Sequence, residues 1–545
     1  MKRILLSILT FIIPFINFAQ EEKVLTFSEQ IDLTFSKYTK WFVDLIFYEI
    51  PFSEEFNIPW VLIVLIGGAT YFTVYFKFIN FSGFFTAIQV VRGKYEDIEK
   101  HGAKVLYGDD GAAAVAVDGD IPDTIRDESA EGEVSHFQAL TAALSATVGL
   151  GNIAGVAVAL SIGGPGATFW MILAGLLGMA SKFAECTLGV KYRDVGPDGT
   201  VYGGPMYYLK KGLAEKKMAG LGKVLAVLFA IFVIGGSFGG GNMFQANQAA
   251  AQFIELTGLT GGNTGLYFGI AMAVLVAVVI IGGIKRIASV TEKIVPFMAG
   301  IYVLAALVIL AVNYVHIGDA FGLIFEGAFS GLGIAGGLIG VMIQGIRRGA
   351  FSNEAGVGSA AIAHSAVRTK YPASEGIVAL LEPFVDTVVI CTMTALVIII
   401  TNFDAGFLEY GTPITEGVEL TATAFDTVIP NFSIILTIAV ILFAFSTMIS
   451  WSYYGMQGWV YLFGKGKISD LVYKLLFLVF VIVGASISLG SVIDFSDAMI
   501  FAMVVPNIIG VLLLTPKVRQ ELIKYNKAIK LKKDAIEDGA EEFEV

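Results

Sequence analysis

The chain has 545 residues, of which 56% are hydrophobic and 15% are charged, with a formal net charge of −11. Soluble domains carry about 25% charged residues, so this composition excludes an ordinary soluble protein, and the apolar content excludes disorder. The negative charge argues against a nucleic-acid partner, and two cysteines are too few for a disulfide scaffold. We therefore expect an all-α polytopic membrane protein, since a transmembrane barrel would show short alternating segments instead.

The opening residues predict a secretory signal peptide over 1–19. Lys2 and Arg3 precede an apolar stretch, and the small residue Ala19 precedes a polar, acidic run, which is the usual layout of a cleaved signal. Asn17 is not the small residue normally found shortly before such a cut, so an uncleaved short anchor is the alternative.

The next segment, 20–58, contains an amphipathic stretch over 27–50, in which aromatic residues such as Trp41 and Phe42 occur together with charged residues such as Lys37 and Lys40. A helix with one aromatic face and one charged face tends to lie in the membrane interface. We expect this segment to lie on the extracytoplasmic membrane surface.

Eleven later segments are long and apolar enough to cross a bilayer, which takes about 20 residues. The predicted spans are 60–80, 137–161, 167–190, 222–250, 264–283, 294–314, 331–367, 375–401, 432–460, 471–490 and 495–515. The first transmembrane helix lies within 59–82, and a polar, acidic segment, 91–135, separates it from the second. We expect this insertion to be a mobile loop, with a small β-hairpin as the alternative.

The charges between the spans predict the orientation. The gaps predicted to lie outside contain no Lys or Arg: 162–166, 251–263, 315–330, 402–431 and 491–494. The gaps on the other side and the tail, 516–545, carry the basic residues, as cytoplasmic segments do. We therefore expect a multi-pass protein of a bacterial inner membrane, with its mature N-terminus outside and both the 91–135 insertion and the C-terminus in the cytoplasm.

In two of the eleven spans, the residues predict that the helix is broken. The second contains Gly149, Gly151 and Asn152 in the middle of an uncharged run. The seventh, 331–367, exceeds the roughly 25 residues of even a tilted helix and carries polar residues at its centre. Glycine also allows close helix packing, but two polar breaks five spans apart are typical of inverted five-helix repeats in a secondary transporter. The repeats would cover 137–314 and 331–515, with one extra helix before them.

Several ordered motifs resemble those of the alanine or glycine:cation symporter family, the sodium:alanine symporters, within the superfamily that shares the leucine-transporter fold. They are ALSATVGLGNIAGVA (143–157), the GGPG…KYR stretch (163–193), YGGPMYYL (202–209), GNMFQAN (241–247), GIKRIASVTEKIVPF (283–297), RGAFSNEAGVGSAAIAH (348–364) and LEPFVDTVVICTMTAL (381–396). The resemblance covers most of 137–515. It implies a leucine-transporter-like fold that binds a small neutral amino acid and a coupling cation.

A zwitterionic solute favours helix termini and neutral amides, which donate and accept hydrogen bonds without adding net charge. The predicted solute residues at the two breaks, on helix four and on helix nine are Gly149, Gly151, Asn152, Asn242, Gln245, Ser352, Asn353, Met448 and Trp451. Hydrogen bonding between helices is the alternative role for the amides. We expect Met448 and Trp451 to wall the pocket and keep it small.

The family resemblance also implies a sodium site made of oxygen ligands. By similarity to the shared fold, helix two supplies the carbonyls of Ser145 and Val148. Helix nine supplies the carbonyl of Phe443 and the hydroxyls of Ser446 and Thr447. Taken alone, such hydroxyls usually bond to their own helix, which is the alternative reading.

Charged residues within spans are costly in a bilayer and are usually paired. The predicted charge network consists of Lys182, Glu185, Arg347, Arg348, Glu354, Glu382 and Asp386. We expect Lys182 to pair with Glu185 at i, i+3, and Arg347, Arg348 or Lys293 to neutralise Glu382 and Asp386. A structural or gate-latching role is favoured over proton transfer, and His364 is expected to be a packing residue.

The sequence thus predicts sodium-coupled symport of alanine, glycine or a similar small neutral amino acid by alternating access. A proton-coupled carrier of the same fold is the main alternative, and it would need a titratable group in the pocket, which the predicted pocket lacks. A channel is a weaker alternative. No nucleophile, base or metal-ligand cluster suggests an enzyme, and Na⁺ is the only ion expected, with no enzymatic cofactor.

Overall fold

The computed structural model describes residues 27–52, 57–96, 98, 114–115, 126–127, 132–196, 199–261, 263–330, 337–412, 417–487 and 489–537. The predicted signal peptide, 1–19, and most of the 91–135 insertion lie outside these residues. The described part is mostly helical, with three short antiparallel strand pairs. The pairs are β1 (Glu49–Pro51) with β2 (Asn57–Pro59), β3 (Ala114–Val115) with β4 (Arg126–Asp127), and β5 (Asp194–Val195) with β6 (Val201–Tyr202).

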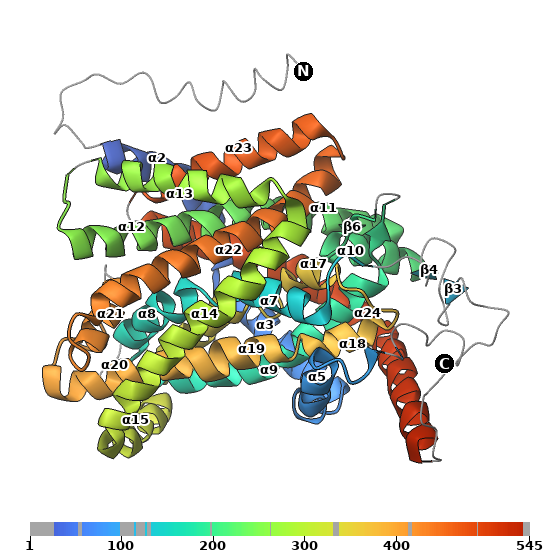
Figure 1. The fold of residues 1–545 in the computed structure, drawn as a ribbon, viewed down its shortest axis with the longest axis horizontal. Coiled ribbons are helices and arrows are strands. Elements are labelled where there is room, and N and C mark those ends of the chain that lie inside the picture. Colours follow the sequence, from blue (N-terminus) through green and yellow to red (C-terminus); the bar gives the residue numbers. More distant parts are fainter. Residues whose placement is uncertain are drawn as a thin grey trace.

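The helices form one bundle, in which segments from both halves of the chain lie side by side (Figure 1). Those of the first half are α2 (Phe27–Ile46), α3 (Trp60–Tyr75), α4 (Ile79–Ser82), α5 (Phe84–Val91), α7 (His136–Thr147), η4 (Leu150–Asn152), α8 (Ala154–Gly163), α9 (Ala167–Lys191), α10 (Pro205–Glu215), α11 (Ala219–Phe238), η5 (Gly239–Met243), α12 (Phe244–Thr257) and α13 (Thr264–Ile280). Those of the second half are α14 (Gly283–Val312), η6 (Tyr314–His316), α15 (Ile317–Ser330), α16 (Gly337–Asn353), α17 (Ala360–His364), α18 (Pro372–Val378), α19 (Leu381–Pro383), η7 (Phe384–Cys391), α20 (Thr392–Ala405), α21 (Gly417–Asp426), α22 (Phe432–Phe463), α23 (Lys467–Gly484) and α24 (Leu489–Glu537).

Six helical stretches of the described residues are long and apolar enough to cross a membrane. They are Ala167–Lys191, Ala219–Thr257, Gly283–Val312, Pro372–Ala405, Phe432–Phe463 and Val492–Asp534. The pair formed by α7 and the stretch Leu150–Gly163 passes the same test together, which makes up to seven spans. Helices α3 and α13 are apolar but shorter. The described residues of the eleven predicted spans lie mainly in helices, but the full count of eleven membrane spans does not follow from helix length and composition alone.

The first predicted break is a bend of 54° between α7 and the stretch that begins at Leu150. The α-helix ends at Thr147, one irregular turn covers 150–152, and α8 starts at Ala154. The side-chain oxygen of Asn152 accepts a bond from the Gly149 N–H at 2.8 Å, so an amide replaces the lost helical partner. The Gly-x-Gly-Asn motif therefore lies at a real interruption of the helix.

The second predicted break separates α16 from α17. Glu354, Gly356 and Gly358 have φ values of 54°, 85° and 91°, a region that strongly favours glycine. Glu354 occupies it without being a glycine, which marks a locally strained backbone. The prediction that the long seventh segment cannot be one straight helix is confirmed for its described part, since 331–336 lie outside it.

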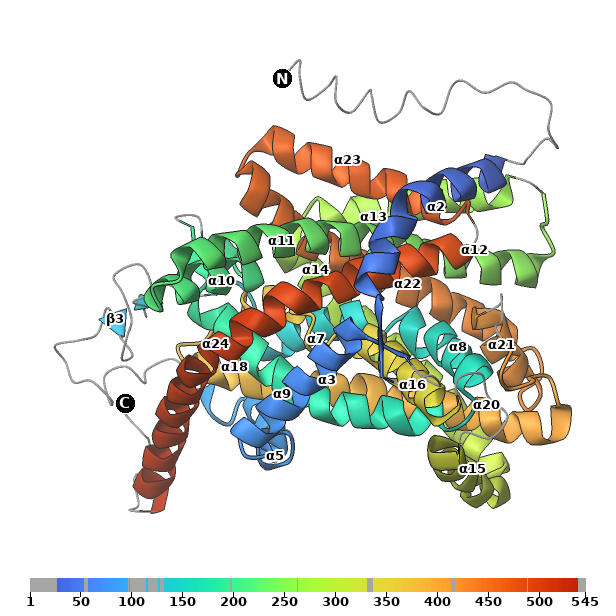
Figure 2. The ribbon, with the colours of Figure 1, turned by 180° about the vertical axis from the view of Figure 1, so that it is seen from behind.

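Two helices cover the outside of the bundle. Figure 2 shows α24 running across the whole molecule from behind, beside α3 and α11, and α2 lying against the same side. In the predicted amphipathic segment, Ile46 is buried and Phe42 packs on Phe232, whereas Trp41 is 66% exposed. One apolar face of α2 therefore rests on the bundle and another points away from it.

Candidate functional site

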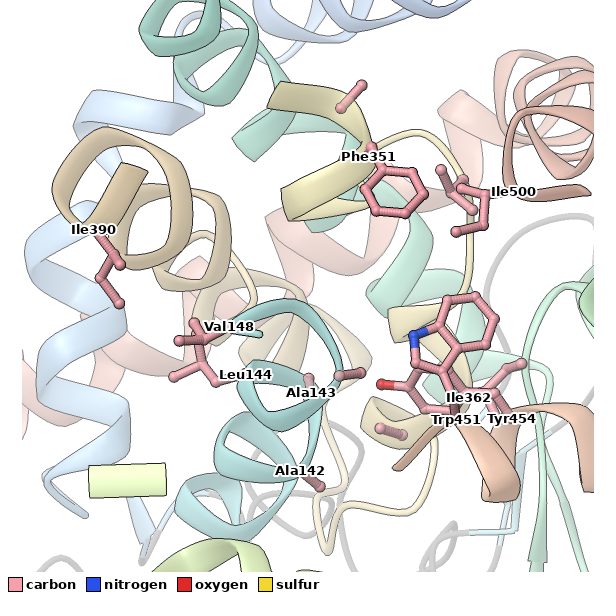
Figure 3. Packing of buried hydrophobic residues seen from close by; sticks show 14 of the residues in the cluster. Ala142, Ala143, Leu144, Val148, Phe351, Ile362, Ile390, Trp451, Tyr454 and Ile500 are labelled. Carbon is pink, nitrogen blue, oxygen red and sulfur yellow. The ribbon is translucent and has the colours of Figure 1, made fainter. Parts of the chain in front are cut away.

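A small cavity lies between the two breaks, and its volume of about 10 Å³ leaves room for about one water molecule in this conformation. Its walls come from α7, η4, η5, α12, α16, α22 and α24, so both halves of the chain contribute. The lining residues are Ala146, Thr147, Gly151, Gly240, Gln245, Phe351, Ser352, Glu354, Trp451 and Ile500. Figure 3 shows Phe351, Ile500 and Trp451 grouped in the apolar packing beside α7.

Of the predicted solute residues, Gly151, Gln245, Ser352 and Trp451 line this cavity. The others are buried nearby but are not part of its wall: Gly149, Asn152, Asn242, Asn353 and Met448. Trp451 approaches the chain so closely at Gly241 that an added Cβ would lie 2.2 Å from the indole ring. Glycine is therefore required at position 241, where η5 passes Trp451.

Gln245 presents an unused acceptor. Its Nε2 donates to the carbonyl of Gly240 at 2.9 Å, while its buried Oε1 finds no donor among the described residues. A Cβ on Gly149 would lie 3.5 Å from this oxygen. A buried acceptor without a donor is costly, and a cavity-facing one is well suited to a solute N–H.

Asp386 on η7 joins the two breaks. Its Oδ1 accepts from Asn152 Nδ2 at 2.7 Å, and its Oδ2 accepts from Ser352 Oγ at 2.9 Å. Asn353 donates to Thr387 at 2.9 Å and accepts from the N–H of Ala355. The polar residues of the breaks thus hold the breaks together as well as lying near the cavity.

Asn242 forms a hydrogen bond between helices, which is the alternative to its predicted contact with the solute. Its Nδ2 donates to the carbonyl of Phe477 on α23 at 2.7 Å, and its buried oxygen has no partner among the described residues. Met448 is fully buried behind the cavity wall. Met448 is thus not among the residues that line this cavity, and its contact with the solute stays a prediction.

The oxygens of the predicted ion site meet where α7 packs on α22. Thr447 Oγ1 lies 3.0 Å from the carbonyl of Ser145, and Ser446 Oγ lies 3.0 Å from the carbonyl of Phe443. Ser145 Oγ in turn donates to the carbonyl of Ser446 at 2.7 Å. The set contains carbonyls and hydroxyls and no carboxylate, which fits a monovalent hard cation at a helix break. None of these hydrogen bonds involves Val148, so its part in the ion site stays a prediction.

The comparisons with known proteins agree with this architecture. The model of the sodium:alanine symporter family matches residues 120–538. The chain belongs to the sodium:alanine symporter family. It is 46% identical over 404 residues to the sodium/alanine symporter AgcS of Methanococcus maripaludis, covering 74% of this chain and 86% of that protein. It is also 36% identical to a putative sodium/proton-dependent alanine carrier protein, YrbD, of Bacillus subtilis, covering 75% and 85% of the two chains.

Among solved structures, the chain is similar in fold to the transporter MhsT in complex with L-phenylalanine, with a TM-score of 0.50 and 16% identity. The match covers 70% of this chain and 89% of MhsT, which has the leucine-transporter fold. Family membership and the apolar helices together make this a multi-pass membrane protein that couples amino-acid transport to a cation. Its relatives are transporters, which supports a transport role and not an enzymatic one.

The buried charges of this symporter pair differently from the prediction. Lys182 pairs with Glu382 at 3.1 Å, not with Glu185, whose Oε1 accepts from Asn507 Nδ2 at 2.6 Å. Glu382 and Asp386 are not neutralised by Arg347 or Arg348. Spacing along one helix suggested the pair of Lys182 with Glu185, but Glu382 of another element is the closer partner of Lys182.

Both arginines instead pair with an aspartate that sequence reasoning missed. Arg347 Nη2 lies 2.7 Å from Asp497 Oδ2, and Arg348 contacts the same oxygen. Asp497 is fully buried near the start of α24. Its position in a predicted apolar span was the available signal, because an uncompensated aspartate there demands a cation.

Glu354 also has an additional role. It was predicted as part of the charge network, and it lines the cavity as well. Trp451 Nε1 donates to its Oε1 at 3.0 Å, and the Ser359 hydroxyl donates to its Oε2 at 2.5 Å. The cavity therefore contains a titratable carboxyl group, contrary to the expectation that it would have none.

Proposed function

We propose that this protein imports alanine, glycine or a similarly small neutral amino acid together with sodium by alternating access. The observation that carries the sodium part is the group of hydroxyl and carbonyl oxygens of α7 and α22 beside the first break. A bound cation would draw these oxygens together across the two helices. The binding energy would then favour one arrangement of the broken helix over another.

The cavity supports a small, neutral solute. The Gln245 oxygen and the Glu354 carboxyl suit an ammonium group, and Gly151 lies three residues before α8, near a helix N-terminus suited to a carboxylate. Trp451, Phe351 and Ile500 restrict the space for a side chain. A bulky side chain would clash with these rings, and a second carboxylate would be desolvated without a partner.

The driving forces are adequate for accumulation. An inside-negative potential of about 100 mV supplies about 2.3 kcal/mol for each charge that enters. A tenfold sodium gradient adds about 1.4 kcal/mol. One sodium ion per solute therefore sustains accumulation of roughly several hundredfold.

The membrane arrangement belongs to the same proposal. The chain would form eleven spans, made of one extra helix and the inverted repeats 137–314 and 331–515. This arrangement would bring the breaks of the second and seventh spans to matching depths in the membrane. The signal peptide 1–19 would be removed, leaving the segment 20–58 outside, and the 91–135 insertion and the tail 516–545 in the cytoplasm of a bacterium with an inner membrane. The absence of Lys and Arg from the predicted outer gaps supports this orientation.

The experiment that tests this function is uptake of labelled alanine and glycine into proteoliposomes, with and without a sodium gradient. We expect sodium-driven uptake, with weak competition by leucine, phenylalanine and glutamate. Equal competition by leucine would contradict the small pocket. Uptake that persists without sodium, but follows a proton gradient, would contradict sodium coupling.

A proton-coupled carrier of the same fold remains the second candidate, because Glu354 lines the cavity. In that case Glu354→Gln would abolish proton-driven uptake but leave solute counterflow, since exchange of solute requires no net proton movement. In a purely sodium-coupled carrier the same variant would not change the response to a proton gradient.

A further inference from the structure

One carboxylate joins the ends of the two broken helices on the side proposed to face the cytoplasm. His136, the first residue of α7, contacts Glu375 Oε2 through Nδ1. His364, the last residue of α17, contacts Glu375 Oε1 through its own Nδ1 at 2.5 Å. Glu375 lies on α18 and is fully buried. We call these three residues the histidine latch.

The backbone reinforces the same junction. Val134 forms a parallel bridge with Val367, and the N–H of Arg368 donates to the Val134 carbonyl at 2.8 Å. These contacts tie the chain just before α7 to the chain just after α17. The histidine latch and this bridge therefore hold the inner ends of both broken helices together, and the latch is the part made of titratable side chains.

The second nitrogen of His364 also faces a carboxylate. Its Nε2 lies 3.4 Å from Glu382 Oε2, and the other oxygen of Glu382 accepts from Lys182 at 3.1 Å. A neutral imidazole has only one N–H, so it can donate to one of two carboxylates. Hydrogen bonding on both sides of His364 therefore requires one additional proton, on the ring or on a facing carboxyl group.

The charge count of the surroundings leads to the same conclusion. The titratable and charged groups of the elements packed around His364 come from several parts of the chain. They are Glu375 (α18), Glu382 (α19), His136 (α7), Lys182, Glu185 and Cys186 (α9), Arg193 (after α9), Glu354 (the second break) and Tyr454 (α22). Arg193 donates to the carbonyl of Ser365 at 2.8 Å and keeps its positive charge. The four glutamates of this group outnumber its two fixed cations, Lys182 and Arg193, so a neutral cluster needs additional protons on its histidines or carboxyl groups. A buried net charge is costly, and the cluster therefore holds an exchangeable proton.

We propose that the histidine latch is a proton-binding site whose occupancy keeps the inner ends of the two broken helices closed, so that cytoplasmic pH controls opening toward the cytoplasm. This inference rests on the proposed function for its orientation and for alternating access. With the proton bound, His364 donates to both Glu375 and Glu382. When the proton leaves to water, one ring lone pair faces a buried carboxylate, and α17 loses its bond to α18 or α19.

The route of the proton to water passes through the latch itself. His136 has a side-chain exposure of 10%, against 0% for Glu375 and His364, so it is the member closest to the surface. The proton is taken from and returned to the same compartment, so the latch adds no net proton movement to the transport cycle. Opening toward the cytoplasm is therefore faster at high internal pH and slower at low internal pH.

A buried cysteine provides a reporter of this opening. Cys186 on α9 is fully buried in a cluster with Ala360 of α17 and Ala379, which follows α18. Separation of α17 from α9 would expose the Cys186 thiol to a thiol reagent. The labelled fraction of the Cys186 peptide, measured by mass spectrometry in proteoliposomes without solute, therefore reports opening without requiring transport.

The first measurement compares the wild-type protein with His364→Gln at pH 6 and pH 9. The glutamine amide keeps hydrogen-bonding capacity but does not titrate in this range. For each protein we take the ratio of the labelled Cys186 fraction at pH 9 to that at pH 6. Dividing the wild-type ratio by the variant ratio removes the pH dependence of the thiol's intrinsic reactivity. We expect the wild-type ratio to exceed that of His364→Gln by about tenfold or more, the effect of losing one buried charged hydrogen bond. His316→Gln, which removes an exposed histidine paired with Asp319, should behave as the wild type. Equal ratios in wild type and His364→Gln would overturn the proposal.

A second variant covers the case in which His364→Gln does not fold. Glu375→Gln removes the negative charge between the two histidines, so the latch holds its proton less tightly. Labelling of Cys186 should then begin to rise at a lower pH than in the wild type. An unchanged or higher pH of onset would overturn the proposal.

The third measurement is sodium-driven alanine uptake at fixed external pH and varied internal pH. The wild-type rate should change with internal pH, whereas the His364→Gln rate should not, and the sodium affinity of the two should agree. Uptake that is independent of internal pH in the wild type would contradict the latch. Absence of any sodium-driven uptake in the wild type would instead contradict the proposed function, while the Cys186 labelling still tests the latch.

Discussion

At the scale of single residues, the proposed ion site consists of a few hydroxyl and carbonyl oxygens. Thr447 reaches across to the carbonyl of Ser145 on another helix, whereas a threonine in a membrane helix commonly bonds to its own backbone. Ser446 does bond within its helix, to Phe443. The cross-helix bond makes Thr447 the most informative residue of the proposed site.

Thr447→Ala should lower sodium affinity about 10- to 150-fold, because an oxygen that ligates a charge contributes about 1.5–3 kcal/mol. Coupling between two bound ligands is reciprocal, so alanine affinity at low sodium should fall as well and should largely recover at saturating sodium. The measurement is the sodium dependence of alanine uptake in proteoliposomes.

The matched control is Thr401→Ala. Thr401 is also buried, and its hydroxyl donates to its own helix at Val397, 2.7 Å away. This variant should leave the sodium dependence unchanged. If Thr447→Ala in folded protein behaves like the control, the hydroxyl serves only the packing of α7 on α22.

A second residue-scale prediction concerns Gly149. A Cβ at this position would lie 2.6 Å from Thr447 Oγ1, so Gly149→Ala should displace that hydroxyl and reduce the affinity for sodium. Gly155→Ala on α8 is the control, since apart from its chain neighbours and the backbone of its own helix no atom lies within 4 Å of the added Cβ. We expect uptake by Gly155→Ala to match the wild type. Equal sodium dependence in Gly149→Ala and the wild type would show that the first break accommodates the added methyl group.

At the scale of elements, buried polar bonds connect the broken helices to their neighbours. Asp386 ties both breaks to η7, and the pair of Lys182 with Glu382 ties α9 to α19. Both members of the latter pair are fully buried. The loss of one partner leaves an uncompensated charge, whereas the loss of both does not.

Lys182→Met should therefore destabilise the protein by about 3–5 kcal/mol, and the double variant Lys182→Met/Glu382→Gln should recover part of that loss. Thermal unfolding in detergent measures both. Lys474→Met, which removes a partly exposed pair with Asp470, should cost at most about 1 kcal/mol. A double variant less stable than the single one would mean that Glu382 matters mainly through His364.

At the scale of the whole molecule, the charges between the spans predict the orientation in the membrane. Cysteines at Ser129 and Thr412, with Cys186 and Cys391 replaced, would be probed by an impermeant thiol reagent on intact spheroplasts. We expect labelling at Thr412, in the acidic gap 402–431, and none at Ser129. The reverse pattern would contradict the orientation and the cleaved signal peptide together, and permeabilised cells provide the control in which both sites react.

The sequence by itself determined the class of protein, the position of the helices and the two interruptions. These features depend on local properties: apolar length, glycine content, and polar residues within apolar runs. Both breaks therefore appeared where Gly149–Asn152 and the stretch around Glu354 predicted them. Family motifs then identified the transporter family, which the family match confirms.

Only the tertiary structure decided which side chains meet. Lys182 and Glu185 are neighbours on one helix, yet Lys182 pairs with Glu382, 200 residues away, and Arg348 pairs with Asp497. The latch of His136, Glu375 and His364 likewise joins three separate elements. Within a bilayer, each buried charge must find the nearest compensating group, and the packing of helices determines which group that is. Spacing along the chain identifies the residues that need partners, and the packed helices supply those partners.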